Sequence, residues 1–439
     1  ANESLIVVTD ITSNGFIAVT QYAKMAGGED AQNAGTEARH DVVIQNAGTI
    51  KNMFLRVSAN AVSAGSTVFT FRRGSTDSGV TVSVGASATG VFEDTTHTQA
   101  VTAGDICKTK IVLPSSANAA CTSKILSYQY DSTTDTTSVL CAHSANNSTT
   151  SASITRFATL NGNLTNQSTE SGTKYRIRKS FTGKYLSVHV NANSRTTNTV
   201  FISRKNGGNG NLTVTFGSSA TGHVTDTTNS DSLAAGDDYN YQWSTGTGTQ
   251  QIVFDHIKCE LLSSGGDSVL SCQVCTVVTQ AEPITNYYAI SGLLTVGQTT
   301  EANYKLKARF AYTISELNCL ITANGITSAS TLNFRKNAAT GNNTVSITAS
   351  TTGLFNDTTH SDTLATTDDI NYQLVTPAVS GTPTISLAWF SVNASSASST
   401  NYDRPIDETG VSVSETLDRI YGANRTITEG SVSSGETLS

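Results

Sequence analysis

The chain has 439 residues, of which 37% are hydrophobic and only 14% charged, and its formal net charge is −7. It contains no apolar run of about 18 residues, which argues against a transmembrane helix. Its scattered Lys and Arg residues argue against a nucleic-acid interface. An abundance of Ser, Thr, Asn and Gly with patterned apolar residues favours β-sheets with polar turns over disorder.

The first 21 residues contain two apolar runs that have no counterpart later in the chain. LIVV occupies 5–8 and FIAV occupies 16–19, and their β-branched residues predict strands. Because no partner strand is evident within the repeat described next, we expect residues 1–21 to form an arm, and either this arm or the C-terminal tail to donate a strand to another subunit. The residues expected at this contact are Leu5, Ile6, Val7, Val8, Phe16, Ile17 and Val19.

One stretch of sequence occurs three times. It reads TGVFEDTTHTQAVTAGDI from Thr89, TGHVTDTTNSDSLAAGDD from Thr221 and TGLFNDTTHSDTLATTDD from Thr352. The copies lie 132 and 131 residues apart, a spacing that indicates three copies of one domain. We expect these domains at residues 22–156, 157–287 and 288–402.

Each copy contains seven to eight short runs in which apolar and polar residues alternate. A Thr-Glu motif at Thr36, Thr169 and Thr300 precedes the first of these runs in each copy, and we interpret it as the opening of the domain. Turn residues follow every eight to twelve positions, which is typical of a β-sandwich or jelly roll. The sequence therefore predicts an all-β fold of three tandem β-sandwich or jelly-roll-like domains.

The last segment, residues 403–439, differs from the repeat. VSVSETL ends at Leu417 and SVSSGETL ends at Leu438, and the first alternates as a strand would. The segment has too little apolar mass to fold alone. We expect a strand-like tail whose subunit contact would be made by Val411, Val413 and Leu417.

Clustered acidic residues in the repeat raise the question of a calcium site. Asp226 and Asp231 lie close together in the second copy, as do Asp357 and Asp362 in the third. Calcium prefers several oxygen ligands, but no calcium-loop motif is present. Asp at turns also accepts hydrogen bonds from its own backbone. We favour turn chemistry and keep calcium as the weaker alternative.

Seven cysteines occur, and they do not follow the repeat. Cys259 and Cys272 flank a predicted hairpin around Gly265 and Gly266, in a register that would place them opposite each other. The pair is either a cross-strand disulfide or two buried thiols. Cys275 follows Cys272 at redox-motif spacing, but alternation along a strand places the two on opposite faces.

No catalytic or cofactor motif is present, so we expect no enzymatic activity and no cofactor. His97 and His360 occupy equivalent positions where the second copy has Asn229, which argues against a metal or catalytic role. Tyr239, Tyr241 and Trp243 could stack on a ligand from the surface, but a place in a sandwich core is the simpler interpretation.

The motif order RKNG, TG-x-F-x-DTT-x-D and GD-x-NYQ resembles the tandem β-sandwich repeats of extracellular microbial filaments and of phage or virion surface fibres. The resemblance covers about residues 22–400 and implies an exported, non-enzymatic protein that assembles. The first copy departs from it, with RRGSTDSG in place of RKNG.

Three tandem sandwiches on short linkers would form a rod, and a donated strand would join rods head to tail. We therefore expect a structural subunit of an extracellular filament whose partners are copies of itself. The alternative is a phage or virion fibre, or a cell-surface adhesin that binds glycans. The sequence favours neither a nucleic-acid partner nor a membrane span.

Overall fold

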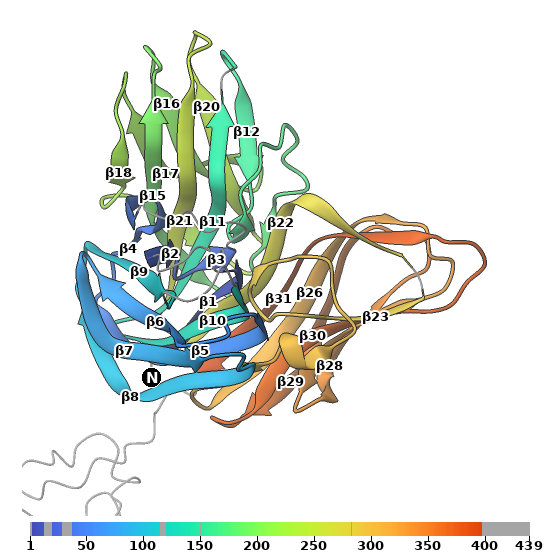
Figure 1. Ribbon diagram of the computed structural model, residues 1–439. Helices are drawn as coiled ribbons and strands as arrows, with labels where there is room; N and C mark the ends of the chain where they lie inside the picture. The colour runs from blue at the N-terminus through green and yellow to red at the C-terminus, as the bar shows by residue number, and fades with distance from the viewer. Residues whose placement is uncertain are drawn as a thin grey trace, which may run out of the picture. The chain divides into compact units, whose positions relative to one another are not determined.

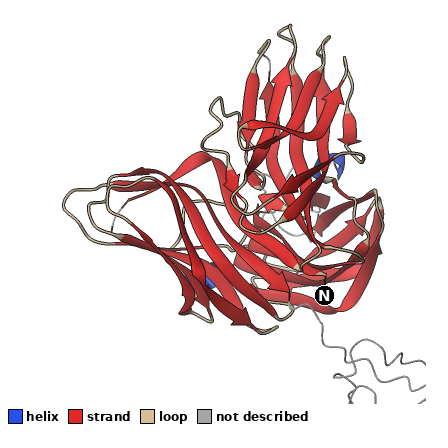
Figure 2. Ribbon diagram, turned by 180° about the vertical axis from the view of Figure 1, so that it is seen from behind, coloured by secondary structure: helices blue, strands red, loops and turns tan. Residues whose placement is uncertain are grey.

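The computed structural model describes residues 2–12, 20–28, 37–114, 120–149, 151–281 and 283–396. Within these ranges the chain forms β-strands and two short 3-10 helices, η1 (Glu37–His40) and η2 (Glu301–Asn303). Figure 2 shows strands throughout, joined by loops. The all-β prediction is confirmed. Among the described residues, no helix has both the length and the hydrophobicity to span a bilayer.

The strands of the described residues pair into six sheets, and two sheets belong to each successive third of residues 2–396 (Figure 1). In the first third, the sheet order is β3-β1-β10-β5-β8 in one sheet and β2-β9-β6-β7 in the other, with β4 beside β9. The bounds are β1 (Glu3–Thr12), β2 (Thr20–Ala23), β3 (Gly27–Gly28), β4 (Val42–Ile44), β5 (Gly48–Asn60), β6 (Ser66–Arg73), β7 (Thr76–Gly85), β8 (Gly90–Val101), β9 (Asp105–Val112) and β10 (Cys121–Ser132).

The second third repeats this plan. One sheet has the order β13-β11-β21-β15-β18, with β19 also on β15, and the other has β12-β20-β16-β17, with β14 beside β20. The bounds are β11 (Thr136–Thr149), β12 (Thr155–Ala158), β13 (Gly162–Asn163), β14 (Tyr175–Arg176), β15 (Phe181–Asn193), β16 (Thr199–Lys205), β17 (Gly208–Phe216), β18 (Gly222–Thr225), β19 (Ser230–Leu233), β20 (Asp238–Thr245) and β21 (Ile252–Ser263).

The last third repeats the plan again. Its sheets have the orders β24-β22-β31-β26-β29 and β23-β30-β27-β28, with β25 beside β30. The bounds are β22 (Asp267–Ala281), β23 (Ile284–Tyr288), β24 (Gly292–Leu293), β25 (Leu306–Lys307), β26 (Tyr312–Asn324), β27 (Ser330–Lys336), β28 (Ala339–Ile347), β29 (Gly353–Leu364), β30 (Asp369–Thr376) and β31 (Thr384–Ser396).

Each third is a jelly roll. When the short strands are set aside, the eight main strands of each third are ordered 1-8-3-6 in one sheet and 2-7-4-5 in the other. This order, in two antiparallel sheets, is the double Greek key of a jelly roll. We call the three pairs of sheets the first, second and third sandwich.

A separate group of buried side chains fills each sandwich. Phe69 and Tyr128 lie in the first group, Phe201 and Trp243 in the second, and Phe334 in the third. Apolar residues alternate with polar ones along β7, β17 and β28, so that one face of each strand is buried. Burial of these faces supplies most of the driving force for folding.

The strand pairing groups the chain differently from the boundaries expected from the repeat. The sandwiches span 3–132, 136–263 and 267–396, so β11 and β22 each open a sandwich instead of closing the one before. Residues Asn2–Ser396 form one compact unit. The division of the chain into three separate domains stays a prediction.

The Thr-Glu motif lies inside each sandwich, between the second and third main strands, so the interpretation that it opens the domain is wrong. Its glutamate forms an ion pair with an arginine of the fourth main strand, at 3.0 Å in Glu170–Arg204 and 3.0 Å in Glu301–Arg335. The first copy keeps the pair between Glu37 and Arg72. The ion pair therefore attaches the loop between the second and third main strands to the sheet that contains the fourth.

Candidate functional site

The predicted donor strand is an integral strand of the first sandwich. Leu5 to Val8 lie in β1, which pairs antiparallel with β10 of the same chain along almost its whole length. Ile6 and Val8 join the first core, whereas Leu5 and Val7 contact the apolar group of the third sandwich. The prediction that this segment is a free arm is therefore wrong, because its partner lies more than 100 residues away in the sequence and leaves no local signal.

The remaining predicted subunit contacts cannot be placed in the same way. Phe16, Ile17 and Val19 lie outside the described residues, and so do Val411, Val413 and Leu417. A role for the tail in subunit contact stays a prediction.

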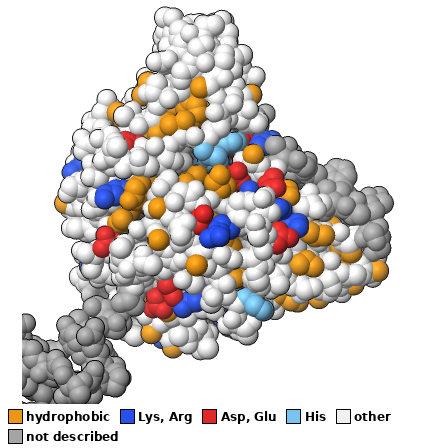
Figure 3. Space-filling view, turned by 90° about the vertical axis from the view of Figure 1, so that its left-hand side faces the viewer, with side chains coloured by type: hydrophobic (Ala, Val, Ile, Leu, Met, Phe, Trp, Pro, Cys, Tyr) orange, Lys and Arg blue, Asp and Glu red, His pale blue; other side chains and the backbone are white. Residues whose placement is uncertain are grey.

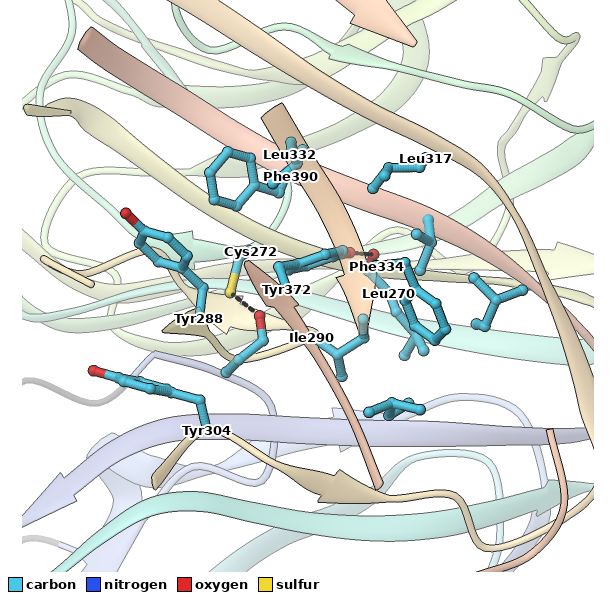
Figure 4. Packing of buried hydrophobic residues seen from close by; sticks show 14 of the residues in the cluster. Leu270, Cys272, Tyr288, Ile290, Tyr304, Leu317, Leu332, Phe334, Tyr372 and Phe390 are labelled. Atoms are coloured by element: carbon cyan, nitrogen blue, oxygen red, sulfur yellow. Dashed lines mark hydrogen bonds between the residues drawn. The ribbon is translucent and has the colours of Figure 1, made fainter. Parts of the chain in front are cut away.

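Of the two alternatives for Cys259 and Cys272, the structure shows two buried free thiols and not a disulfide. They lie on β21 and β22, which are consecutive strands but belong to different sheets in different sandwiches. The segment around Gly265 and Gly266 joins two sandwiches and does not form a hairpin. Figure 4 shows the Cys272 thiol among apolar side chains, where it donates a hydrogen bond to the carbonyl oxygen of Ala289 at 3.0 Å. Burial raises the pKa of the Cys259 thiol to about 12.

The Asp-Thr-Thr corners are held by hydrogen bonds to the acidic side chain. The Asp226 carboxylate accepts from the backbone N–H groups of Thr213, Thr228 and Asn229 at 2.9 to 3.0 Å. Asp94 and Asp357 accept the equivalent bonds in the other copies. Burial raises the pKa of each carboxyl, but the donated hydrogen bonds outweigh it and hold each pKa at about 2.

The exchange of His for Asn at the corner has a simple cause. The Nδ1 atoms of His97 and His360 lie 3.0 and 2.9 Å from the corner aspartate, and the amide of Asn229 donates to its aspartate at 2.9 Å. All three residues supply one polar contact to the same carboxylate. The corner therefore joins the fifth main strand to the sixth in every copy.

The second predicted acidic position makes contacts with other strands. Asp231 accepts from the hydroxyls of Ser203 and Tyr239 at 2.5 and 2.7 Å, and Asp362 accepts from the backbone of Asn342. These donors lie 8 to 28 residues away in the sequence, so the turn interpretation does not describe Asp231 and Asp362. In the described part of the chain, no group of three His, Cys, Asp or Glu side chains is arranged to hold a metal ion.

The aromatic residues considered as stacking groups are core residues. Tyr239, Tyr241 and Trp243 are fully buried in the second sandwich, and the Trp243 ring contacts Phe254 at 5.2 Å between centroids. A glycan-binding surface built on these residues is therefore wrong.

Three glycines meet where the sandwiches join. Gly27, Gly162 and Gly292 lie on the short strands β3, β13 and β24, which contact one another. Each has a positive φ, between +85° and +108°, a conformation that glycine adopts without strain. A Cβ atom on Gly292 would lie 2.9 Å from the carbonyl oxygen of Gly27, and one on Gly162 would lie 2.8 Å from that of Gly292.

Each pair of sandwiches is joined by a hydrogen bond to a backbone carbonyl, and we call these three contacts the joints. Lys258 of the second sandwich donates to the carbonyl oxygen of Val43 in the first at 2.7 Å. Trp389 of the third donates to Lys174 of the second at 2.8 Å. Arg56 of the first donates to Lys305 of the third at 3.2 Å. The acceptors Val43, Lys174 and Lys305 are each 131 residues apart, so the sandwiches contact one another cyclically.

This cyclic contact corrects the expectation of a rod. In a rod each sandwich would touch only its neighbours in sequence, but Leu5, Val7 and Phe54 of the first sandwich pack into the apolar group of the third. Arg309 and Glu93 add an ion pair at 3.1 Å between the same two sandwiches. Sequence reasoning missed the joint, and the only available signal was a Gly at a roughly equivalent place in each copy.

Comparisons with known proteins leave the family open. No protein-family model matches the sequence, and no curated protein matches it. Among solved structures, one described as the triple jelly roll fold and turret assembly of an archaeal virus is 12% identical over 89% of this chain and 91% of its own, with a TM-score of 0.18. A structure of Sulfolobus Turreted Icosahedral Virus is 12% identical over 86% and 92%, with the same TM-score.

A third similar structure is that of a bacterial toxin. An insecticidal delta-endotoxin of Bacillus thuringiensis is 7% identical over 60% of this chain and 53% of its own, again with a TM-score of 0.18. At these identities and scores the likenesses carry no argument about the function of this chain.

Proposed function

We propose that this chain is a non-enzymatic structural subunit of an extracellular or virion-surface assembly built from copies of itself. The observation that carries the proposal is the cyclic contact of three jelly rolls within one chain. Each sandwich contains all eight main strands in cis, and each joint buries the outer face of one sheet against the next sandwich. The described body is therefore complete without a strand from another subunit.

Few large hydrophobic side chains of this body are strongly exposed. Among the described residues, only Val224 and Val296 have more than a third of their surface exposed, at 36% and 66%. Stable subunit contacts normally need an apolar centre. A contact between subunits would instead use main-chain hydrogen bonds at a sheet edge, where affinity comes from strand pairing.

The tail has the composition for such pairing. In VSVSETL the apolar residues Val411 and Val413 alternate with Ser412 and Ser414, so a strand formed there would have one apolar face. We propose that this segment adds to an edge strand of a neighbouring subunit, which would produce a head-to-tail polymer.

The test compares substitutions on the two faces of this segment in the full chain. One variant carries V411D, V413D and L417D, and the matched control carries S412D and S414D. Sedimentation velocity and negative-stain electron microscopy measure assembly, and circular dichroism checks folding. We expect the wild type and the control to form regular assemblies and the apolar-face variant to stay a folded monomer.

Two outcomes would contradict the proposal. If the apolar-face variant assembles as the wild type does, pairing through the tail is wrong. If the wild type itself stays monomeric at high concentration and binds immobilised glycans, the adhesin alternative replaces the structural role.

A further inference from the structure

The joint between the first and second sandwiches contains a row of four histidines. His143 on β11 lies opposite His256 on β21, His256 lies opposite His189 on β15, and His189 lies opposite His223 on β18. Directly opposed residues project from the same face of a sheet. The ring centroid of His189 lies 4.4 Å from that of His223 and 6.0 Å from that of His256.

The equivalent rows at the other two joints are different. On the sheet of β22 the row consists of Gln273, Trp389, Leu320 and Leu354. On the sheet of β1 it consists of Thr9, Ile125, Arg56 and Val91. Histidines therefore occupy this row only at the joint between the first and second sandwiches, although all three joints are built from equivalent strands.

Charged groups of the first sandwich face the histidine row. The Nζ atom of Lys24 lies 3.4 Å from Nε2 of His143. Arg39 forms an ion pair at 2.8 Å with Asp255, whose other carboxylate oxygen lies 2.9 Å from Nδ1 of His189. Of the row, only His223 is partly exposed, with 17% of its side chain accessible. Figure 3 shows histidine side chains on one face of the molecule, with acidic and basic side chains nearby. The other titratable or charged groups at this joint are Glu37, His40 and Asp41, Lys108 on β9, and Lys258 and Glu260 on β21.

These charges are largely matched before any histidine is protonated. Lys108 pairs with Glu37 and Asp41, Lys258 pairs with Glu260 at 2.5 Å, and Arg39 pairs with Asp255. The carboxylates nearest the row are already paired, Asp41 with Lys108 and Asp255 with Arg39, so a proton on His223 or His256 would gain no carboxylate within hydrogen-bond distance. A buried charge without a partner strongly disfavours the closed joint.

Two members of the row are unsuited to carrying a proton. Among the described residues, neither ring nitrogen of His223 or His256 has a hydrogen-bond partner, and His256 is fully buried. The Oδ2 atom of Asp41 lies 3.9 Å from Nε2 of His223, which is beyond hydrogen-bond distance. Burial lowers the pKa of His223 to about 3, with His189, Lys108 and Lys24 lowering it further and Asp255 opposing them. Burial likewise lowers the pKa of His256 far below its ordinary value.

The direction of the pH effect follows from these surroundings. In the opened joint the two imidazoles would regain the ordinary pKa of 6.5, so the opened form binds more protons than the closed one. The closed joint is therefore fully stable above that pKa. Its stability falls progressively as the pH drops below about 6.5.

We propose that the histidine row makes this joint an acid-sensitive latch, which holds the first and second sandwiches together near neutral pH and releases them in mildly acidic solution. The two other joints lack the row and stay closed over the same range. The inference does not depend on the proposed structural role, because it concerns contacts within one chain.

Hydrogen exchange on the full chain, followed by mass spectrometry and corrected for intrinsic rates, tests the latch. We compare exchange at about pH 7.5 and about pH 5 in residues 37–44, which cover the row, and in residues 304–307 and 173–177 at the other joints. We expect residues 37–44 to exchange at least about thirtyfold faster at the lower pH, because a single imidazole whose pKa rises from about 3 to 6.5 on opening shifts the equilibrium by about that factor at pH 5. The two other segments should change little.

Two variants make the test specific. H223L/H256I introduces the residue types found in the equivalent rows, and it should keep residues 37–44 protected at both pH values. H97N/H360N removes two exposed corner histidines in favour of the residue that the second copy carries, and it should open as the wild type does. If the double variant does not fold, H223L alone should shift the opening to lower pH.

Three results would overturn the latch. The first is unchanged protection of residues 37–44 in the wild type down to about pH 4.5. The second is opening of H223L/H256I at the same pH as the wild type. The third is protection at neutral pH that depends on added zinc and is lost with a chelator, which would assign the row to metal binding.

Discussion

The indole nitrogen of Trp389 donates a 2.8 Å hydrogen bond to the carbonyl oxygen of Lys174, and this bond joins the third sandwich to the second. The Trp389 ring also lies 5.4 Å from the ring of Tyr175, the next residue along. One side chain thus supplies both the polar and the aromatic part of the joint. The donors at the other two joints, Lys258 and Arg56, are charged residues at other strand positions, so equivalent carbonyl acceptors are paired with different donors.

Replacing Trp389 by Phe should weaken this joint. The Lys174 carbonyl would lose its donor, and the net contribution of such a bond is about 0.5–1.5 kcal/mol. Trp243→Phe is the matched control, because Trp243 is equally buried and its indole nitrogen has no hydrogen-bond partner among the described residues. Urea unfolding should show W389F to be less stable than W243F by about 1 kcal/mol. Equal losses would show that the bond contributes nothing.

Gly162→Ala should be far more damaging than a typical glycine substitution. The new methyl group would clash with the carbonyl oxygen of Gln273 and would approach that of Gly292. Gly222→Ala is the control, since Gly222 also has a positive φ but has open space around its Cβ position. We expect G222A to cost about 1–2 kcal/mol of backbone strain, and G162A to cost several kcal/mol more or to prevent folding. Thermal unfolding and size-exclusion chromatography distinguish the two, and similar behaviour would contradict close packing at this centre.

Asp226→Ala should destabilise the second sandwich by leaving three backbone N–H groups without an acceptor. The expected loss is about 1–3 kcal/mol or more. Asp77→Ala is the control, because the Asp77 side chain is 44% exposed and its pairing with Lys110 lies at the surface, where ion pairs contribute about 0–1 kcal/mol.

The same carboxylates predict an acid transition distinct from that of the histidines. The pKa values of Asp94, Asp226 and Asp357 lie at about 2 in the folded chain, below the ordinary 3.8. Their stabilisation is therefore present above about pH 4 and is lost as the pH falls towards about 2. Urea unfolding at a series of pH values should show this decline. It should be shallower in D226A, and an unchanged slope would contradict the role of the corner.

Cys259 and Cys272 should behave as separate, inaccessible thiols. Burial raises the pKa of both, and the thiolate is the reactive form. Alkylation at neutral pH should leave both unmodified in the native chain and modify both in urea without reductant. Peptide mapping identifies the sites. A peptide pair cross-linked through these residues under non-reducing conditions would show that the disulfide exists after all.

The repeat in the sequence predicted the sheets better than it predicted where each sandwich begins. The spacing of the Asp-Thr-Thr corners gave the period, and every corner lies at the same place in its sandwich. A repeat period, however, does not indicate at which residue each repeat begins. The expected boundary at 157 therefore placed β11 in the first sandwich, whereas β11 pairs with β21 of the second. The pairing of β11 with β21 links residues more than 100 positions apart, and no local pattern reveals it.

For the candidate contacts too, features that depend on neighbouring residues were predicted better than pairings between distant strands. The turn interpretation of Asp226 needed only neighbouring residues and agrees with its hydrogen bonds. The hairpin expected around Gly265 also used neighbouring residues, but two consecutive strands entered different sheets there. Alternation in β1 predicted a strand correctly, although its pairing with β10 was hidden.

The sequence by itself determined the all-β class, the threefold repetition and the chemistry of the turns, because strand alternation and turn geometry depend on residues close together in the chain. Only the tertiary structure decided that the three sandwiches close on one another through Gly27, Gly162 and Gly292, and that four histidines from four strands meet at one joint. Those contacts join residues that are far apart in sequence, and packing alone brings them together.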